Sequence, residues 1–303
     1  MRSCAICGDG RSTLLHRQEF LFPGQPAAVH YDVVACAACG FVYADDIPQQ
    51  SSLDDFYQTA EHHLHATRVP EGLRVIHADF FDYVRRHAPI SANSSVLDVG
   101  CGMGHFLNHF KAAGHARLRG IEPSPASVRL ARELYGIEVV AGTIDTYQTS
   151  ETYDLVSLCG VLEHIADLDA AVRRIAALCA DAGSVFIAVP DAGTFGDAPP
   201  HEPFLEFALE HINFFTRATL DDLFARHGFV PIHCETHWND FYRNNYILGL
   251  YRRAAGHAGT SSACVDQTGR SSVERYVAMS KARLAATVAR IEPLVASREP
   301  VVI

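Results

Sequence analysis

The stretch that decides the fold reads Val96-Leu97-Asp98-Val99-Gly100-Cys101-Gly102-Met103-Gly104 and continues into a helical pattern over residues 105–113. Its first four residues predict a short buried strand. The three glycines that follow predict a turn in which a ligand can lie against the backbone, because a Cβ there would collide with it. A strand that passes through such a turn into a helix is typical of the nucleotide-binding opening of a doubly wound α/β sheet.

The spacing inside this loop discriminates between ligands. It reads G-x-G-x-G, whereas the dinucleotide fingerprint is G-x-G-x-x-G, and Asp98 stands two residues before Gly100. A carboxylate here repels a pyrophosphate but suits a ligand with positive charge, such as the amino and sulfonium groups of S-adenosylmethionine. Glu122 ends the next strand, 22 residues beyond Gly100, where an acid accepts both ribose hydroxyls. An NAD-dependent oxidoreductase is therefore disfavoured.

Beyond the loop, apolar strand patterns alternate with helical ones. We expect strands at residues 96–99, 117–121, 137–140, 153–158, 184–189, 229–234 and 245–251. We expect helices at residues 125–135, 168–180 and 219–227 between them. This alternation predicts βαβ units around a parallel sheet, a Rossmann-like domain over residues 91–254.

Four of the nine cysteines form two CxxCG motifs near the N-terminus: Cys4, Cys7, Cys36 and Cys39. Zinc binds four thiolates tetrahedrally, and a two-residue gap lets one turn present two sulfurs to the same ion. The 28 residues between the pairs (8–35) predict a larger hairpin than a minimal zinc ribbon. Four unrelated buried cysteines and a redox CxxC are the alternatives. A closed four-cysteine site leaves no position for water, so we expect a structural zinc ion.

The domain organisation follows from changes in composition. Residues 1–50 are expected to form a zinc-binding β module, and residues 51–90 a helical lid interrupted at Pro70-Glu71-Gly72. Residues 255–271 are rich in glycine, serine and alanine and predict a linker to a long helix over 272–297. Residues 298–303 resemble the first strand of a further, truncated C-terminal domain.

Composition and charge exclude several classes of protein. The 303 residues are 48% hydrophobic and 20% charged, with a net charge of −10 and no apolar run of membrane-spanning length. The N-terminus has no apolar signal-peptide region, so nine cysteines indicate reduced thiols or metal ligands in a cytoplasmic protein. The acidic balance disfavours a nucleic-acid or anionic-membrane binder.

Loop, acid and strand order together resemble the class I S-adenosylmethionine-dependent methyltransferases, whose first motif is D-x-G-x-G-x-G. The resemblance spans residues 90–254 and includes the strand at 153–156 and the stretch at 161–165. It implies that Ile144 and Asp145 lie near the adenine and that residues 159–161 flank the methionine part. The cofactor-binding residues implied in this way are Asp98, Gly100, Cys101, Gly102, Gly104, Glu122, Pro123, Ile144, Asp145, Cys159, Gly160 and Val161.

Methyl transfer to a hydroxyl or a carbon acid also requires a base close to the acceptor. His164 follows the fourth strand of the predicted sheet, and the pair Glu210-His211 follows the fifth. A histidine beside a carboxylate can act as a base at neutral pH. The alternatives are that His164 packs or caps and that His211 anchors the turn before Phe214-Phe215. His62, His63, His65 and Tyr57 in the lid fit a solvated or a packed face.

The layout as a whole resembles bacterial sugar methyltransferases with an N-terminal CxxC…CxxC zinc module, including nucleotide-sugar C-methyltransferases. Those proteins carry a tyrosine two residues before a Glu-His pair, and the histidine is implicated as the base. Glu210 and His211 match, but the tyrosine position is Ala208, so O-methylation is expected at least as much as C-methylation. The resemblance implies a small-molecule acceptor, a sugar or sugar-nucleotide of surface-polysaccharide or natural-product biosynthesis.

Two other functions stay open at this point. One is a zinc-containing RNA methyltransferase, although residues 1–90 carry 7 basic and 11 acidic side chains, where an RNA-binding ribbon should be positive. The other is a non-catalytic module that binds the cofactor and engages a partner protein. The long helix at 272–297 could mediate dimerisation or bridge to a further domain, so the oligomeric state is not predicted.

Overall fold

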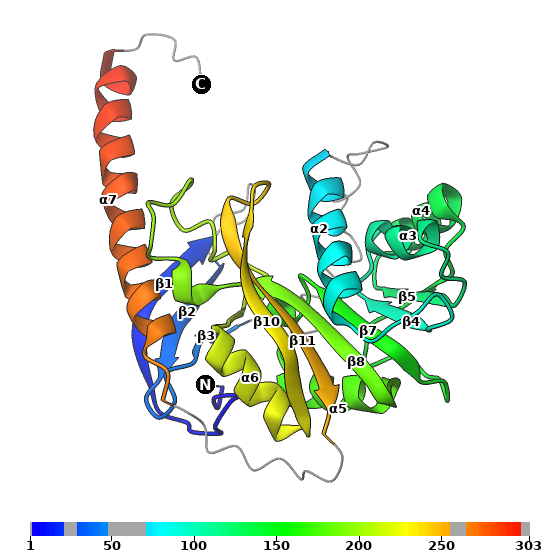
Figure 1. Cartoon of the computed structure of the whole chain (residues 1–303). Coiled ribbons are helices and arrows are strands. Elements are labelled where there is room, and N and C mark those ends of the chain that lie inside the picture. Colours follow the sequence, from blue (N-terminus) through cyan, green and yellow to red (C-terminus); the bar gives the residue numbers. More distant parts are fainter. Residues whose placement is uncertain (1, 21–28, 48–70, 255–264, 298–303) are drawn as a thin grey trace.

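The computed structural model describes residues 2–20, 29–47, 71–254 and 265–297 and contains two β-sheets (Figure 1). The predicted first helix of the lid, with Tyr57 and the three neighbouring histidines, lies outside these residues. The strands are β1 (Ser12–Phe20), β2 (Val29–Cys36), β3 (Val42–Asp45), β4 (Val96–Val99), β5 (Leu118–Glu122), β6 (Val139–Ala141), β7 (Tyr153–Cys159), β8 (Cys179–Pro190), β9 (Asn213–Phe214), β10 (Phe229–Asn239) and β11 (Asn244–Arg253). The α-helices are α2 (Glu71–His87), α3 (His105–Ala112), α4 (Pro125–Tyr135), α5 (Leu168–Leu178), α6 (Arg217–Arg226) and α7 (Thr268–Ser297).

The larger sheet has seven strands in the order β10-β11-β8-β7-β4-β5-β6. The five strands from β8 to β6 are parallel, whereas β11 runs antiparallel to both β8 and β10. The chain leaves β4 toward β5 on one side and later returns to β7 on the other, so the strand order reverses at β4. Ligands of doubly wound sheets bind at such a reversal, beyond the carboxyl ends of the strands. The predicted Rossmann-like fold is confirmed.

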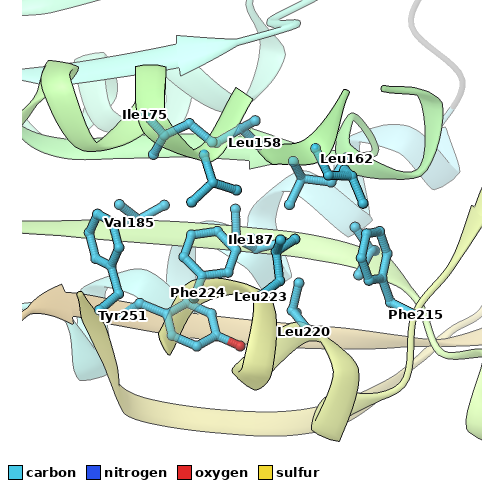
Figure 2. Packing of buried hydrophobic residues seen from close by; sticks show 14 of the residues in the cluster. Leu158, Leu162, Ile175, Val185, Ile187, Phe215, Leu220, Leu223, Phe224 and Tyr251 are labelled. Atoms are coloured by element: carbon cyan, nitrogen blue, oxygen red, sulfur yellow. The ribbon is translucent and has the colours of Figure 1, made fainter. Parts of the chain in front are cut away.

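Helices cover both faces of this sheet and bury its apolar side chains. On one face α2, α3 and α4 pack in a cluster that includes Phe80, Phe106 and Phe110. On the other face, α5 and α6 enclose Leu158, Ile175, Ile187 and neighbouring residues, with the rings of Phe224 and Tyr251 stacked 4.5 Å apart (Figure 2). These two layers fix the strands rigidly, and hence the loops at their carboxyl ends.

The smaller sheet joins the N-terminal segment to the rest of the chain. Its order is β1-β2-β3-β9, and all its pairs are antiparallel. The hairpin predicted between the cysteine pairs is formed by β1 and β2. The fourth strand, β9, comes from residues 213–214, far along the sequence, so the cysteine segment shares a sheet with the segment that carries His211.

Several element boundaries differ from those predicted, and for two of them the structure shows the physical cause. The helix expected to reach residue 180 ends at Leu178, because Cys179 already pairs with Tyr153 and begins β8. The helix expected to begin at residue 272 begins at Thr268, because the Asp266 carboxylate accepts the Thr268 amide at 2.9 Å and caps it. Both shifts come from contacts that local composition does not reveal.

The first half of α7 packs against the smaller sheet, where Val273, Tyr276 and Val277 join Tyr31 and Phe207 in one buried cluster. The rest of α7 extends past the body of the molecule (Figure 1). Among the described helices, none combines the length and the apolar character needed to cross a lipid bilayer.

Candidate cofactor and acceptor site

The glycine loop lies between β4 and α3, at the point where the strand order reverses. Its three glycines have φ angles of +67°, +52° and +79°, a left-handed backbone that favours glycine. At Gly100 a Cβ would stand 2.6 Å from a methyl group of Val161, whereas at Gly102 it would meet open space within 4 Å. The amides of Gly100 and Cys101 donate to the Ile121 carbonyl, which ties the loop to β5. A ligand can therefore approach the backbone at Gly102.

Glu122 lies beside this loop at the end of β5 and is buried. One carboxylate oxygen accepts the Gly102 amide and the other accepts the Ser124 amide, both at 2.9 Å. Burial raises the pKa of this group, while the two amides oppose the shift. Each carboxylate oxygen has a second lone pair, so Glu122 can hold the loop and still accept hydrogen bonds from the hydroxyls of a ligand.

Asp98 is buried in β4, directly under the loop, and its Oδ1 accepts a hydrogen bond from the Ser157 hydroxyl at 2.7 Å. Burial, with a smaller contribution from the charge of Glu122, raises the pKa of Asp98 to about 7, although the Ser157 hydrogen bond opposes the shift. A cation placed close to the carboxylate would favour its ionised form. The environment of Asp98 therefore suits a positively charged ligand, as the sequence suggests.

The other predicted cofactor residues lie at the same edge of the sheet. Pro123 follows β5, Ile144 and Asp145 lie in the turn after β6, and Cys159 ends β7 before Gly160 and Val161. Ile144 is buried and Asp145 is exposed. Since β6, β5, β4 and β7 are parallel neighbours, all twelve residues come together along one edge. Their individual contacts with adenine, ribose and methionine stay predictions.

Two of the predicted catalytic residues, His164 and His211, lie next to each other although 47 positions separate them. Their ring centroids are 5.0 Å apart, with the planes tilted by 50°. The Nδ1 atom of His164 is 2.9 Å from the Glu210 carbonyl, and that of His211 is 3.2 Å from the Glu206 carbonyl. Because a carbonyl only accepts, each Nδ1 carries the proton and each Nε2 carries the lone pair.

The third predicted catalytic residue, Glu210, contacts both histidine segments. It holds His164 through its backbone carbonyl rather than acting only as the neighbour of His211. Burial lowers the pKa of His211, and the Glu210 charge partly opposes that shift. The imidazole is therefore neutral near pH 7 and able to accept a proton.

Sequence reasoning missed Glu163, which completes the cluster. Its Oε1 is 4.0 Å from the His164 Nε2, and ligand atoms of Glu163, His164 and His211 all lie within 4.8 Å of one another. Glu163 is 2% exposed, and its Oε2 has no hydrogen-bond partner among the described residues. Burial raises its pKa to about 8. The one sequence signal was its place directly before His164, in the short turn that follows β7.

A second buried carboxylate belongs to Glu206, whose backbone carbonyl bonds to His211. Both of its oxygens are 3.2 Å from the Asn244 amide nitrogen, and burial raises its pKa to about 7. Burial raises the pKa of Tyr246 well above its ordinary value, and the charges of Glu163 and Glu206 add to that shift. The region next to the histidines is therefore rich in hydrogen-bond acceptors.

A family model described as "Methyltransferase domain" matches residues 73–234, more than half of the chain. The chain belongs to this methyltransferase family. The match covers the glycine loop, Glu122, Glu163 and both candidate histidines.

Relatives of this methyltransferase domain include enzymes of different substrate classes. The ubiquinone biosynthesis O-methyltransferase of Xanthomonas oryzae pv. oryzae (strain PXO99A) is 31% identical over 146 residues, 46% of this chain and 60% of that protein. A tRNA U34 carboxymethyltransferase of Shewanella oneidensis is 32% identical over 110 residues, 34% of this chain and 32% of that protein. The chain thus spans less than two thirds of the curated relatives it matches.

Solved structures agree on the fold. Magnesium protoporphyrin IX methyltransferase from Synechocystis PCC 6803, solved with bound SAM, superposes with a TM-score of 0.52 at 13% identity. The superposition covers 68% of this chain and 98% of that one. The 1,6-didemethyltoxoflavin-N1-methyltransferase of Burkholderia thailandensis gives 0.50 at 18% identity, covering 72% and 98%. These structures confirm the S-adenosylmethionine-dependent methyltransferase fold.

The four N-terminal cysteines of the methyltransferase cluster around one point. The Sγ atoms of Cys4 and Cys39 are 3.5 Å apart, those of Cys7 and Cys36 are 3.4 Å apart, and all four lie within 4.8 Å of one another. Gly8 and Gly40, after each pair, have positive φ angles and donate their amides to the carbonyls of Cys4 and Cys36. Four convergent thiols are a donor set that fits a tetrahedral zinc ion.

Proposed function

We propose that the protein is an S-adenosylmethionine-dependent methyltransferase. The observation that carries this proposal is the glycine loop, open at Gly102, between a buried Asp98 below it and Glu122 beside it. The membership of the methyltransferase family supports the same conclusion. In this assignment Glu122 accepts hydrogen bonds from the ribose hydroxyls, and Asp98 faces the positively charged methionine end of the cofactor. Ile144 and Asp145 lie next to the adenine.

The chemistry of the proposed reaction needs a methyl donor, a positioned acceptor and a base. S-adenosylmethionine, when bound, supplies a methyl group attached to a positively charged sulfonium. When the methyl group is transferred, the sulfur becomes the neutral thioether of S-adenosylhomocysteine. The acceptor must lose a proton as its new bond to carbon forms. We assign His211 as the base that accepts this proton. Its Nδ1–H donates to a carbonyl, so its Nε2 carries the lone pair that can take the proton. His164, held in the same tautomer, orients the acceptor beside it.

The proposed acceptor is a small molecule with hydroxyl groups, a sugar or a sugar-nucleotide. The resemblance to zinc-module sugar methyltransferases supports this class. The buried carboxyl group of Glu163 beside the two histidines supports it as well, because its unpartnered Oε2 can accept a hydrogen bond from a hydroxyl group. With Ala208 in place of a tyrosine, transfer to oxygen is the assigned outcome, and transfer to carbon is the alternative.

The proposal extends to the N-terminal cysteines, which we assign to a structural zinc ion. A site with four protein thiolates has no open position for an acceptor or water, so this ion takes no part in the reaction. Its role is to hold the turns at residues 4–8 and 36–40 together, next to the smaller sheet.

Calorimetric titration with S-adenosylhomocysteine tests the cofactor assignment. We expect micromolar affinity for the wild type, as an order of magnitude, and about tenfold weaker binding for Glu122→Gln, which loses the charge on the ribose acceptor. Glu138→Gln, an exposed acid just before β6 at the opposite edge of the sheet, serves as the control. Absence of binding by folded protein would contradict the proposal. Release of S-adenosylhomocysteine with a panel of nucleotide sugars then tests the acceptor class.

A further inference from the structure

The guanidinium of Arg2 connects three separate segments of the chain. Its Nη1 donates to the carbonyls of Ala44, at 3.0 Å, and Ile212, at 3.4 Å. Its Nη2 donates to the carbonyl of Ala166 at 2.8 Å and to the Asn213 side-chain oxygen at 3.2 Å. Ala44 belongs to the cysteine module, Ile212 directly follows His211, and Ala166 stands two residues after His164. One side chain thus touches the module and both histidine segments.

We propose that Arg2 is a positioning residue through which the four-cysteine module sets the placement of His164 and His211. The role of the two histidines rests on the proposed function, whereas the physical coupling does not. Arg2 acts through these segments and touches none of the groups assigned to the reaction.

Backbone pairing reinforces this coupling. In the smaller sheet Tyr43 pairs with Asn213, and the Ala44 amide donates to the Ile212 carbonyl at 2.9 Å. The Tyr31 hydroxyl of β2 donates to the Ala208 carbonyl at 2.9 Å, in the loop that leads to His211. The loop on the N-terminal side of His211 and the strand on its C-terminal side are therefore both held by the cysteine module.

The two histidine segments are also bound to each other, so a shift in one moves the other. The Ile212 amide donates to the Glu163 carbonyl at 2.8 Å. The Asn213 side-chain nitrogen donates to the carbonyls of Leu162 and Ile165 at 3.0 and 2.8 Å. Because Arg2 also binds the Asn213 oxygen, it orients the amide that makes these two bonds.

The position of Arg2 depends in turn on the cysteine site. Arg2 stands two residues before Cys4, and its own amide donates to the Asp45 carboxylate at 2.7 Å. Other contacts hold the module to different parts of the fold: Arg226 binds the carbonyls of Ala5 and Ile6. Those contacts reach α6 rather than the histidines. Loss of the Arg2 side chain should therefore weaken the link to the histidines while Arg226 still attaches the module to α6.

The cofactor loop is held by different partners. Gly100 and Cys101 bond to Ile121, and Gly102 bonds to Glu122. A loss of Arg2 should therefore disturb the histidines and leave the cofactor site in place. This separation distinguishes a positioning role from a general loss of stability.

Arg2→Gln tests the proposal, with Arg17→Gln as the matched control. Arg17 lies in the same module and pairs with Asp32, but it is half-exposed and binds within the β1–β2 hairpin. In Arg2→Gln we expect about tenfold faster exchange of the Ile212 amide, as local opening becomes easier. We also expect the imidazole titration of His211, followed by NMR, to move toward its ordinary value as water enters. Affinity for S-adenosylhomocysteine and the zinc content should equal those of Arg17→Gln.

Wild-type exchange at Ile212 and wild-type titration of His211 in Arg2→Gln would overturn the proposal. Loss of zinc from that variant would overturn it too, because the effect would then come from the cysteine site itself. If Arg2→Gln does not fold, Arg2→Lys takes its place, since an ammonium cannot reach all four acceptors at once. Failure of S-adenosylhomocysteine to bind the wild type would refute the proposed function, while the exchange and titration results would still decide the coupling.

Discussion

The cofactor end and the histidine end of the site are built in different ways. The residues that surround Gly102 come from one strand, its turn and the end of the neighbouring strand, all between residues 96 and 124. The histidine cluster draws on Arg2, on β3, on the turn at 162–166 and on residues 206–214. The glycine loop and Glu122 thus come from one continuous stretch of the chain, although β6 and β7 contribute to the same edge of the sheet. The histidine cluster is assembled from four distant segments.

This difference separates two kinds of constraint. The cofactor loop is fixed by the positive φ angles of its glycines and by hydrogen bonds to Ile121 and Glu122, which lie nearby in the sequence. The histidines are fixed by carbonyls supplied by other segments, and burial keeps them neutral. A substitution at one end should therefore leave the other end intact, and the predictions below test that independence.

The largest effect is expected for His211→Ala. Removal of the assigned base should lower turnover by about 10²–10⁴-fold, while affinity for S-adenosylhomocysteine stays as in the wild type. His201→Ala, an exposed histidine in the same connecting segment, provides the control. Steady-state rates and calorimetry on both variants give the comparison. Near-normal turnover would transfer the role of base to another group, with His164 as the first candidate.

Cys36→Ser should disturb the histidine end of the site indirectly, through the four-cysteine module. Loss of one thiolate should release the zinc ion and destabilise the protein by about 3 kcal/mol, several degrees in melting temperature. Cys179→Ser, a buried cysteine away from the module, should leave the zinc content unchanged. Metal analysis and thermal unfolding provide the measurements. Full zinc content in Cys36→Ser would contradict the four-cysteine assignment.

Gly100→Ala should distort the glycine loop at the cofactor end of the site. The new methyl group would stand 2.6 Å from Val161 at a φ of +67°, so the loop must shift. We expect about 30-fold weaker binding of S-adenosylhomocysteine, or about 2 kcal/mol. Gly114→Ala has a similar φ penalty at +93°, meets open space and lies away from the site, so it should keep full affinity. Equal affinities in the two variants would argue against a role for the loop in binding.

The smallest effect concerns Glu163→Gln and pH. The folded state keeps Glu163 protonated to about pH 8, whereas the unfolded chain ionises it near 4.5. Between these values the folded state binds more protons, so this group lowers stability as pH rises. Gln does not ionise. The free energy of unfolding of the variant, relative to wild type, should therefore rise by about 1 kcal/mol from pH 5 to pH 6.

Denaturant titrations at these two pH values measure that difference. Glu133→Gln, whose side chain is exposed, should show no such trend. Asp98 and Glu206, whose pKa values burial raises to about 7, are present in both proteins and cancel in the comparison. A flat difference across this range would mean that Glu163 is already ionised in the folded protein at pH 5.

Sequence patterns predicted the large sheet and the cofactor edge because they are encoded locally. Apolar strand runs, the three glycines and the acid 22 residues downstream can be recognised without knowledge of any distant contact. The boundaries at Leu178 and Thr268 were wrong because a strand pairing and a carboxylate cap decided them. Glu163 was missed because only burial next to a histidine distinguishes it from an ordinary surface acid.

By itself, the sequence determined the order of strands and helices, the convergence of four cysteines and the glycine loop with its acidic partners. Each depends on residue types at short, fixed spacing. Only the tertiary structure decided that β9 completes the sheet of the N-terminal module and that Arg2 reaches both histidines. It also decided that the backbone carbonyl of Glu210 accepts a hydrogen bond from His164. These features join residues more than 40 positions apart. They depend on hydrogen bonds to backbone carbonyls, which every residue carries, so the sequence of side chains does not predict them.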